Sequence, residues 1–488
     1  MQKKLVHHIN NQLPNLLENI KTTHDQRETR KQALETARDA FTEQFLNKTK
    51  YYYNQSTELF YTYNDYDYSI IKEDDIQHQI LTSITHNKQL MSWKYKIKTN
   101  IIKQIRERDI LKSIPESSTI QSVINNLYPT LFKTRNHAKY FLTIIGDIIL
   151  KKTDLFYFIP SNAKNYLNDL NQQSCMLLGF SNLLNTFKFK YYEHNYSYCR
   201  LIDINDSVES INIWNQLYKQ QMINFFCVAA HYSTRYNSAD NFLTKHSKDN
   251  ELIQHSLYLK KNTDDSIIRK FISHSTEGGK DCKISWKNIL YLWKQFIDEM
   301  KIPNVIFSTT LKTKLINLLY YSSDDDCFLN LTSKQIPIVS QFMTFWDTCI
   351  DTSSDEIELE VDELSTLFNN WLNKNTLNIS DSVVLGLVKH FYTDVVMEED
   401  KYLVNVGCKL WDKNADINLS LNQYKQICKT AKLETPQPIY NAYESYCHHC
   451  DKQGNIVSKR YFEKFFMDTY SEYLDDDSFI KKEWWDVS

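Results

Sequence analysis

The amino-acid sequence predicts a mainly α-helical, multidomain protein with small β-hairpins, and three observations lead to this prediction. The chain has 488 residues, more than one ordinary hydrophobic core organises, so two to four domains are expected. Apolar residues recur along most of it at the three- and four-residue spacing of amphipathic helices. Only 7 glycines and 8 prolines occur, which disfavours folds whose phosphate-binding loops or nucleophile turns need glycine.

The composition is that of a folded, soluble chain, with 42% hydrophobic and 24% charged residues. The formal charge of −3 excludes a histone-like polycation, so any contact with nucleic acid must come from a local patch. The longest apolar stretch, Tyr140 to Leu150, is about half a bilayer span, and the chain starts without an apolar signal segment. The ten cysteines are mostly single, as is typical of reduced thiols. We therefore expect an intracellular protein without a membrane span.

The first part of the chain alternates helix and hairpin patterns. Residues 1–50 are expected to form peripheral helices with a thin apolar stripe. Alternating aromatic residues from Phe60 to Ile70, interrupted by Asn64-Asp65, predict a hairpin, and Glu73-Asp74-Asp75 then begin a helix. The apolar stripe consists of Leu34, Ala37, Phe41 and Phe45. The predicted domains are N-terminal helices (1–50), a hairpin plus helical domain (51–130), a central helical domain (131–260), a linker (261–283) and C-terminal helical modules (284–488).

Two apolar runs, 139–150 and 222–230, are expected to be buried in the central domain. The C-terminal modules contain a weak internal repeat. In each copy, a helix with an aromatic face is followed by a serine that begins a second helix. The middle copy leads into alternating residues around Glu398-Glu399-Asp400, which predict a β-hairpin. Two capped helices followed by a hairpin have the outline of a winged helix; a chance recurrence of helix pairs is the alternative.

The three copies start near Ile289, Leu364 and Ile439, and their second helices begin at Ser308, Ser380 and Ser458. From this repeat, we expect Trp293, Trp371 and Tyr443 at equivalent core positions.

The sequence contains no complete catalytic or metal-binding motif. Gly278-Gly279-Lys280 resembles part of a phosphate-binding loop, but Asp281 replaces the required Ser or Thr and His274 replaces the upstream glycine. Cys447-His448-His449-Cys450 cannot all ligate one zinc ion, because neighbours on a helix point about 100° apart. Acidic runs such as Asp324–Asp326 fit solvated loops, helix starts or partner contacts. We therefore expect no catalytic residue, no bound metal, no cofactor and no nucleotide hydrolysis.

Basic residues interleaved with aromatic ones predict contacts with nucleic acid, because cations neutralise phosphates and rings stack on bases. A first patch follows Trp93, and a second, Phe187 to Tyr192, alternates strictly and predicts a strand with one aromatic and one cationic face. A third comprises Lys133, Arg135, His137 and Lys139. The alternative is that lysine stems cover core aromatic rings while their ammonium groups stay in water. The candidate nucleic-acid-binding residues are Trp93, Lys94, Tyr95, Lys96, Lys98, Lys103, Arg106, Lys188 and Lys190.

Four segments of the chain resemble uncharacterised proteins of giant cytoplasmic DNA viruses, the mimivirus-like lineage. They are Tyr52–Ile84, Ala138–Asp147, Phe189–His194 and the final Glu483-Trp484-Trp485. The abundant Asn, Lys, Ile and Tyr are similar to what the AT-rich genomes of these viruses encode. More remotely, the hairpin and helix at 60–84 and the winged-helix-like copies resemble accessory parts of viral D5-type primase-helicases. The Walker A loop and arginine-finger core of that family are absent, so the resemblance implies no ATPase activity.

Together these features predict a non-enzymatic, nucleic-acid-associated viral protein that acts in genome replication or expression in the host cytoplasm, at the viral factory. Nucleic acid and other viral or host proteins are the expected partners, and no membrane is. One alternative is a protein–protein scaffold, similar to the helical scaffold of translation initiation. The cap-binding peptide of such scaffolds has no match, because the interval from Tyr53 to Leu59 is one residue too long. The other alternative, an enzyme of unfamiliar type, is disfavoured by the scarcity of glycine.

Overall fold

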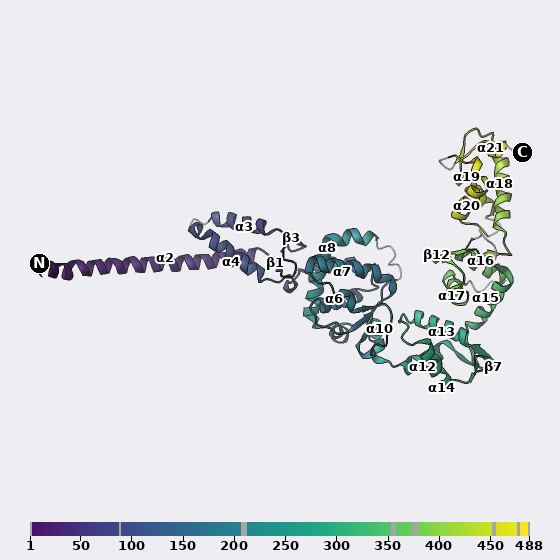
Figure 1. Ribbon diagram of the computed structural model, residues 1–488, viewed down its shortest axis with the longest axis horizontal. Helices are drawn as coiled ribbons and strands as arrows, with labels where there is room; N and C mark the ends of the chain where they lie inside the picture. Colours follow the sequence, from purple (N-terminus) through teal and green to yellow (C-terminus); the bar gives the residue numbers. More distant parts are fainter. Residues whose placement is uncertain are drawn as a thin grey trace. The chain divides into compact units, whose positions relative to one another are not determined.

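The computed structural model describes residues 2–86, 89–205, 212–352, 358–372, 379–450, 455–475 and 479–486. Helices dominate these residues (Figure 1). The sheets have two or three strands each, which confirms a mainly α-helical chain with small β elements. The chain divides into two compact units. Unit 1 comprises Met1–Lys270 and Phe296–Leu315, and unit 2 comprises Phe271–Gln295 and Ile316–Ser488.

Unit 1 begins with helices, as predicted. They are α1 (Gln2–His7), the π-helical turn η1 (His8–Gln12) and the long α2 (Leu13–Lys48). Only the C-terminal end of α2 is buried, where Phe45 and Leu46 join a core with isoleucines of α3 (Glu73–Thr85) and α4 (Lys94–Arg106). The core residues contributed by α3 and α4 are Ile76, Ile80, Ile84, Ile97, Ile101, Ile102 and Ile105.

The predicted hairpin is confirmed as part of a three-stranded antiparallel sheet, β1 (Tyr51–Asn54), β2 (Leu59–Tyr63) and β3 (Tyr68–Ile71). Its tight turn forms because Asn64 Oδ1 accepts hydrogen bonds from the backbone N–H groups of Tyr66 (2.9 Å) and Asp67 (2.7 Å). An Asx turn of this kind favours asparagine at the first turn position.

The larger core of unit 1 is built around two helices whose side chains are buried on nearly every face. These are α6 (Arg135–Ile149) and the C-terminal half of α8 (Asn212–Tyr236), and the buried apolar runs 139–150 and 222–230 lie on them as predicted. Beside them lies a parallel sheet in the order β5-β4-β6, which the sequence did not predict. Its strands and linking helix are β4 (Phe156–Phe158), α7 (Lys164–Leu178), β5 (Phe187–Lys188) and β6 (Cys199–Leu201).

The remaining elements of this part of the chain are short. They are η2 (Met91–Trp93), η3 (Ile110–Lys112), α5 (Ser117–Leu127), η4 (Ser161–Ala163), η5 (Leu183–Asn185), η6 (Tyr196–Tyr198), α9 (Ala239–Asn241), η8 (Phe242–His246), α10 (Asn250–Ser256) and α11 (Tyr258–Lys261).

Gly146 of α6 lies directly against the backbone of α8. Replacing it with alanine is therefore expected to destabilise the protein. A Cβ atom at this position would lie 2.1 Å from the carbonyl oxygen of Ala229 and 2.8 Å from Cβ of Ser233. In an open helix, glycine to alanine stabilises by about 1 kcal/mol. Here the clash is with the backbone of α8, so the net effect of Gly146→Ala is a loss of roughly 1–3 kcal/mol.

Chemical denaturation of the full chain measures this effect, and Gly386→Ala is the matched control. Gly386 lies within α17 (Asp381–Phe391), and the nearest atom to an added Cβ is Gln295 Nε2 at 3.5 Å, an ordinary contact. The control is expected to leave stability equal or to raise it by up to about 1 kcal/mol. Equal stabilisation by both substitutions would show that α6 and α8 do not approach each other in this way.

The C-terminal half contains three successive series of elements with the same connectivity. Each series runs helix, strand, helix, helix and hairpin, and the first strand pairs with the second strand of the hairpin. This is the connectivity of a winged helix. The middle series shows it in full, with the sheet order β11-β13-β12. Its elements are α15 (Ile336–Cys349), β11 (Glu358–Glu360), α16 (Val361–Trp371), α17, β12 (Met397–Glu398) and β13 (Tyr402–Val404), with β10 (Ile350–Asp351) and β14 (Gly407–Cys408) paired beside them.

The first series has the sheet order β7-β9-β8. Its strands lie in unit 2, whereas its three helices each cross the boundary between the units. Its elements are α12 (Asp264–Ser275), β7 (Glu277–Ser285), α13 (Trp286–Glu299), α14 (Ser308–Leu318), β8 (Tyr321–Ser322) and β9 (Cys327–Thr332).

In the third series the hairpin is reduced to a single bridge between Leu474 and Ile480. Its elements are α18 (Lys413–Thr430), β15 (Gln437–Pro438), α19 (Ile439–Cys450), α20 (Lys459–Tyr470), η9 (Ser471–Tyr473) and β16 (Phe479–Ile480), followed by α21 (Glu483–Asp486).

The three predicted helix pairs are therefore present at their predicted places, but two details differ. Residues 261–283 do not form an extended linker, because Ile267, Ile268 and Phe271 are buried and hold this segment as α12, followed by β7. Trp293 is buried, but Trp371 and Tyr443 are only half-buried. The expectation of equivalent core positions is wrong for these two rings, since the buried aromatic rings of their helices are Phe368 and Tyr446.

Candidate nucleic-acid interface

Helix α4 carries most of the predicted nucleic-acid contacts, and its two faces differ. Ile97, Ile101 and Ile105 are fully buried in the core shared with α2 and α3. On the opposite side Tyr95 is 64% exposed. Because residues three, four and seven apart share a helix face, this side presents a ring together with cations. It consists of Tyr95, Lys96, Thr99, Lys103 and Arg106.

Two of the predicted cations have partners on α3. Lys98 Nζ donates a hydrogen bond to Gln77 Oε1 (3.0 Å), and the Arg106 guanidinium donates one to Glu73 Oε2 (2.8 Å). The hydrogen bond with Glu73 raises the pKa of Arg106. Lys98 and Arg106 therefore help to hold α4 against α3, and a phosphate would have to compete with these partners.

Lys94, Lys96 and Lys103 form no ion pair with the residues that the structure describes. The ammonium of Lys96 lies 5.0 Å from the ring centroid of Trp93, and that of Lys94 lies 4.9 Å from the ring of Tyr95. Trp93 itself is half-buried against the core of α3 and α4. The packing alternative thus applies to Trp93, whereas Tyr95 is the ring that a base could reach.

The second patch does not form the predicted strand. β5 contains only Phe187 and Lys188, which pair with Tyr157 and Phe158 of β4. Because β4 ends at Phe158, the residues after Lys188 have no partner strand. The prediction of an alternating strand to Tyr192 is therefore wrong beyond its first two residues.

The two cations of this patch are separated from those of α4. The ammonium of Lys188 lies 5.4 Å from the ring centroid of Phe156, and Lys190 is exposed. Phe187 belongs to the core around α6 and α8, whereas the inner face of α4 belongs to the core of α3 and the end of α2. The two patches thus lie over different cores.

The third patch serves the packing of unit 1. Lys133 Nζ pairs with Asp203 Oδ2 (2.6 Å), and Lys301 pairs with the other oxygen (3.3 Å). His137 is buried, and burial lowers its pKa. Burial also lowers the pKa of Lys139. This third patch therefore lacks a set of exposed, unpaired cations on one face, such as Lys96 and Lys103 form on α4.

Charge is distributed unevenly along the chain. Residues 1–263 contain 33 lysine and arginine residues against 25 acidic ones, and residues 264–488 contain 24 against 35. The imbalance is steepest in the middle winged-helix series, where residues 336–408 contain 3 basic and 13 acidic residues. The negative charge of this series opposes contact with phosphates.

The hairpin turns of the winged-helix series are acidic where they are described. Asp324–Asp326 lie between β8 and β9, and Glu398, the last residue of β12, is followed by Glu399 and Asp400 in the turn to β13. Nearby cations are paired with them: Lys389 Nζ lies 2.6 Å from Asp400, and the Arg460 guanidinium lies 3.3 Å from Glu398. Negative charge at these hairpin turns repels the phosphates of a nucleic-acid backbone.

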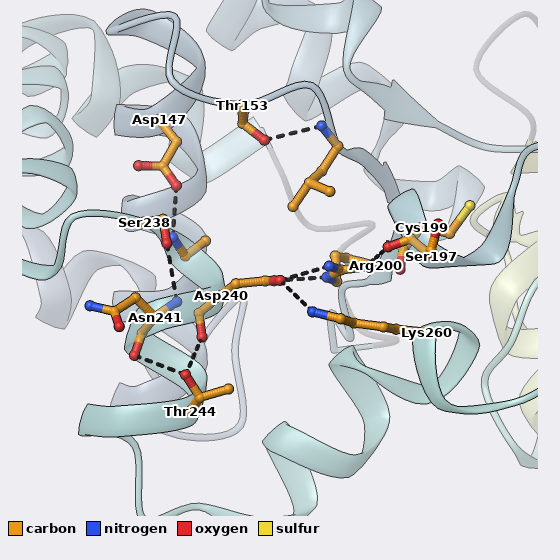
Figure 2. A network of polar contacts seen from close by, with 12 residues as sticks. Asp147, Thr153, Ser197, Cys199, Arg200, Ser238, Asp240, Asn241, Thr244 and Lys260 are labelled. Atoms are coloured by element: carbon orange, nitrogen blue, oxygen red, sulfur yellow. Dashed lines mark hydrogen bonds and ion pairs between the residues drawn. The ribbon is translucent and has the colours of Figure 1, made fainter.

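A buried polar network in unit 1 was missed by sequence reasoning (Figure 2). Arg200 is 2% exposed, makes two hydrogen bonds to the Asp240 carboxylate (2.7 and 2.6 Å), and donates to the carbonyl oxygens of Ser197 and Cys199. Lys260 also pairs with Asp240 (3.1 Å). These contacts join β6, α9 and α11. Single residues forty positions apart leave no local motif, so only the fold reveals them.

The motifs considered for catalysis fall in regular structure. Gly278-Gly279-Lys280 lies in strand β7, not in a loop between a strand and a helix, and Cys447 to Cys450 form the last turn of α19. Among the described residues, no three His, Cys, Asp or Glu side chains are grouped to hold a metal ion, and no helix is both long and apolar enough to cross a membrane. Comparison of the chain with family models, with curated proteins and with solved structures found no match.

Proposed function

We propose that the protein is a non-enzymatic, nucleic-acid-associated factor of a giant cytoplasmic DNA virus, acting in genome replication or expression in the host cytoplasm. The observation that carries the nucleic-acid part is the outer face of α4. There Lys96 and Lys103 have no acidic partner among the described residues, and Tyr95 is largely exposed beside them. The viral origin rests on the sequence resemblance alone.

The spacing on α4 suits a phosphate backbone. Lys96 and Lys103 are seven residues apart on one face, which is about 10 Å along the helix axis. A nucleic-acid strand presents several phosphates over that length, so both ammonium groups can contact one strand. Tyr95 offers a flat surface on which a base can stack, independently of base identity. The geometry therefore fits single-stranded or duplex backbone contact without sequence specificity.

Removing the charge of Lys96 or Lys103 is expected to weaken binding of nucleic acid equally for all sequences. Each substitution to glutamine removes one phosphate contact, so the slope of log affinity against log salt falls by about 0.7–0.9. Tyr95→Ala is expected to cost about 1–3 kcal/mol through lost stacking, with the salt slope unchanged. Fluorescence anisotropy with labelled oligonucleotides at several salt concentrations measures both effects.

Two controls separate this interface from general electrostatics. Lys98→Gln removes a cation that is already bonded to Gln77, so its slope change should be smaller than that of Lys96→Gln. Lys464→Gln removes an exposed cation of α20, in the acidic half of the chain, and should leave binding unchanged. If all four lysine variants bind like the wild type, α4 is not the interface.

A protein–protein scaffold is the second candidate function, and the acidic middle winged-helix series favours it. Its 13 acidic residues against 3 basic ones would select a partner with a basic face. Purification of the tagged protein from infected cells, with and without nuclease, tests this function. Partner proteins that remain bound after nuclease, and are lost when the charges of Glu398–Asp400 are reversed, would support docking at the hairpin between β12 and β13. Loss of all partner proteins after nuclease would instead support the nucleic-acid function and contradict the scaffold.

A further inference from the structure

We propose that the N-terminal helix associates with the same helix of a second copy of the chain. Every large aliphatic side chain between residues 5 and 20 is between 46% and 63% exposed, although all of them lie in helical segments. Soluble surfaces expose single apolar residues, but a continuous series of them marks an interaction site. The side chains are Leu5, Val6, Ile9, Leu13, Leu16, Leu17 and Ile20, here called the N-terminal stripe.

No residue that the structure describes covers this stripe. In α2 the buried side chains are Thr42, Phe45 and Leu46, all in its last two turns. Neither α1 nor η1 has a buried residue. Helices in proteins owe most of their stability to packing of an apolar face, so a partner surface is needed to stabilise the first half of this helical segment.

The spacing of the stripe is that of a helix-to-helix seam. Val6, Ile9, Leu13, Leu16 and Ile20 follow one another at intervals of three, four, three and four residues. This alternation is the a and d pattern of coiled coils, whereas a helix that covers a globular core has a wider apolar face. The π-helical turn η1 interrupts the regular α-helical geometry within the seam. The part of the seam with regular α-helical geometry therefore lies on α2.

The charges near the stripe favour an identical partner. Glu18 and Asp25 lie on the far side of the helix from the seam, and Lys21 lies at the border of the stripe, four residues after Leu17. The positions flanking the seam carry amides or leucines up to Ile20, so two copies meet without like charges. Beyond it the same face becomes basic at Arg27, which ends the seam.

A membrane surface fits the stripe less well. Helices that lie in the interface of a bilayer carry Trp, Phe or Leu on the apolar face and many Lys or Arg on a strongly charged polar face. The first aromatic residue of this chain is Phe41, which is partly buried against the core of α2, α3 and α4, and the polar face near the stripe is rich in Asn and Gln. The apolar area also suffices for pairing, because seven half-exposed side chains offer on the order of 600 Å² per chain, near the ~800 Å² of a standard interface.

The mass of the full chain in solution tests this proposal. Sedimentation equilibrium of the wild type at micromolar concentrations is expected to give a mass above the 58.1 kDa of one chain, rising with concentration. The double variant Leu16→Lys, Ile20→Lys is expected to sediment as a single chain. Its thermal unfolding should match that of the wild type at low concentration, because both side chains are exposed and contact no core.

The matched control places the same two charges off the seam. Asn15→Lys, Thr22→Lys adds lysines on the opposite side of α2 and is expected to associate like the wild type. A wild type of one-chain mass throughout the concentration series would overturn the proposal, as would association that survives Leu16→Lys, Ile20→Lys. A third outcome would also overturn the proposal. If the wild type does not self-associate but floats with anionic vesicles, and Leu16→Lys, Ile20→Lys abolishes the flotation, the stripe binds a membrane.

Discussion

Replacing Lys413 with methionine is expected to destabilise unit 2 by about 3–5 kcal/mol. Lys413 is 5% exposed and forms an ion pair with Glu363, which is itself buried. Its ammonium also donates a hydrogen bond to the carbonyl oxygen of Glu358 (3.0 Å) and lies 4.5 Å from the ring centroid of Tyr461. Removing one partner leaves the other charge buried without compensation, which is far worse than removing an exposed ion pair.

The loss should depend on pH in a defined direction. Burial raises the pKa of Glu363, although the charge and hydrogen bond of Lys413 lower it. Without Lys413, burial and the charge of Glu360 are opposed only by the hydrogen bond from the backbone N–H of Glu360, so the pKa of Glu363 rises further above its unfolded value. A carboxyl group of this kind favours folding below its unfolded pKa, and that contribution is lost as the pH rises through the folded pKa. Lys413→Met should therefore lose less stability near about pH 5 than near about pH 8.

Chemical denaturation at the two pH values, followed by limited proteolysis to locate the unfolded part, measures this effect. Lys409→Met removes an exposed neighbouring lysine and should change stability by less than about 1 kcal/mol. The double variant Lys413→Met, Glu363→Gln removes both charges and should be closer to the wild type than Lys413→Met alone. If the double variant instead shows the sum of two separate losses, the two side chains do not interact.

Sequence patterns predicted the three helix pairs of the C-terminal half because each helix is amphipathic and several have local start signals, but they did not predict α12, α15 and α18, the first helix of each series. Ser308 is the first residue of α14, and Ser380 and Ser458 are the N-caps of α17 and α20. At α20 the cap is made by the side chain, because Ser458 Oγ accepts a hydrogen bond from the backbone N–H of Tyr461, whereas the side chain of Ser380 makes no such bond at α17. Such signals are local, so a single sequence is enough to read them.

Features set by contacts distant in sequence were not predictable in this way. The strands of the parallel sheet in unit 1 have only two or three residues each, too few for a period of two to be recognised. Residues 261–283 are polar and therefore predict a linker, yet Ile267 and Phe271 bury one face of α12 within this segment. At the candidate interface, pattern identified the cations of α4, but only the fold shows that Arg106 is paired with Glu73.

Replacing Arg200 with methionine is the second substitution with a large expected effect, a loss of about 3–5 kcal/mol from unit 1. The guanidinium donates to both oxygens of Asp240 and to the carbonyl oxygens of Ser197 and Cys199 (Figure 2). Methionine fills a similar volume but donates no hydrogen bond, so these buried acceptors lose their partner. Burial raises the pKa of Asp240, but hydrogen bonds from Arg200 and Lys260 outweigh it and hold that pKa below its usual value.

Lys260→Met provides the sharpest comparison, because Lys260 pairs with the same carboxylate from a side chain that is 45% exposed. Solvent screens this second pair, so its removal should cost no more than about 1 kcal/mol. Both variants remove one positive charge next to Asp240, and a difference between their denaturation midpoints therefore measures burial and hydrogen bonding instead of net charge. Equal losses from the two variants would mean that Arg200 is not enclosed between β6 and α9, and that this part of unit 1 is held by its apolar core alone.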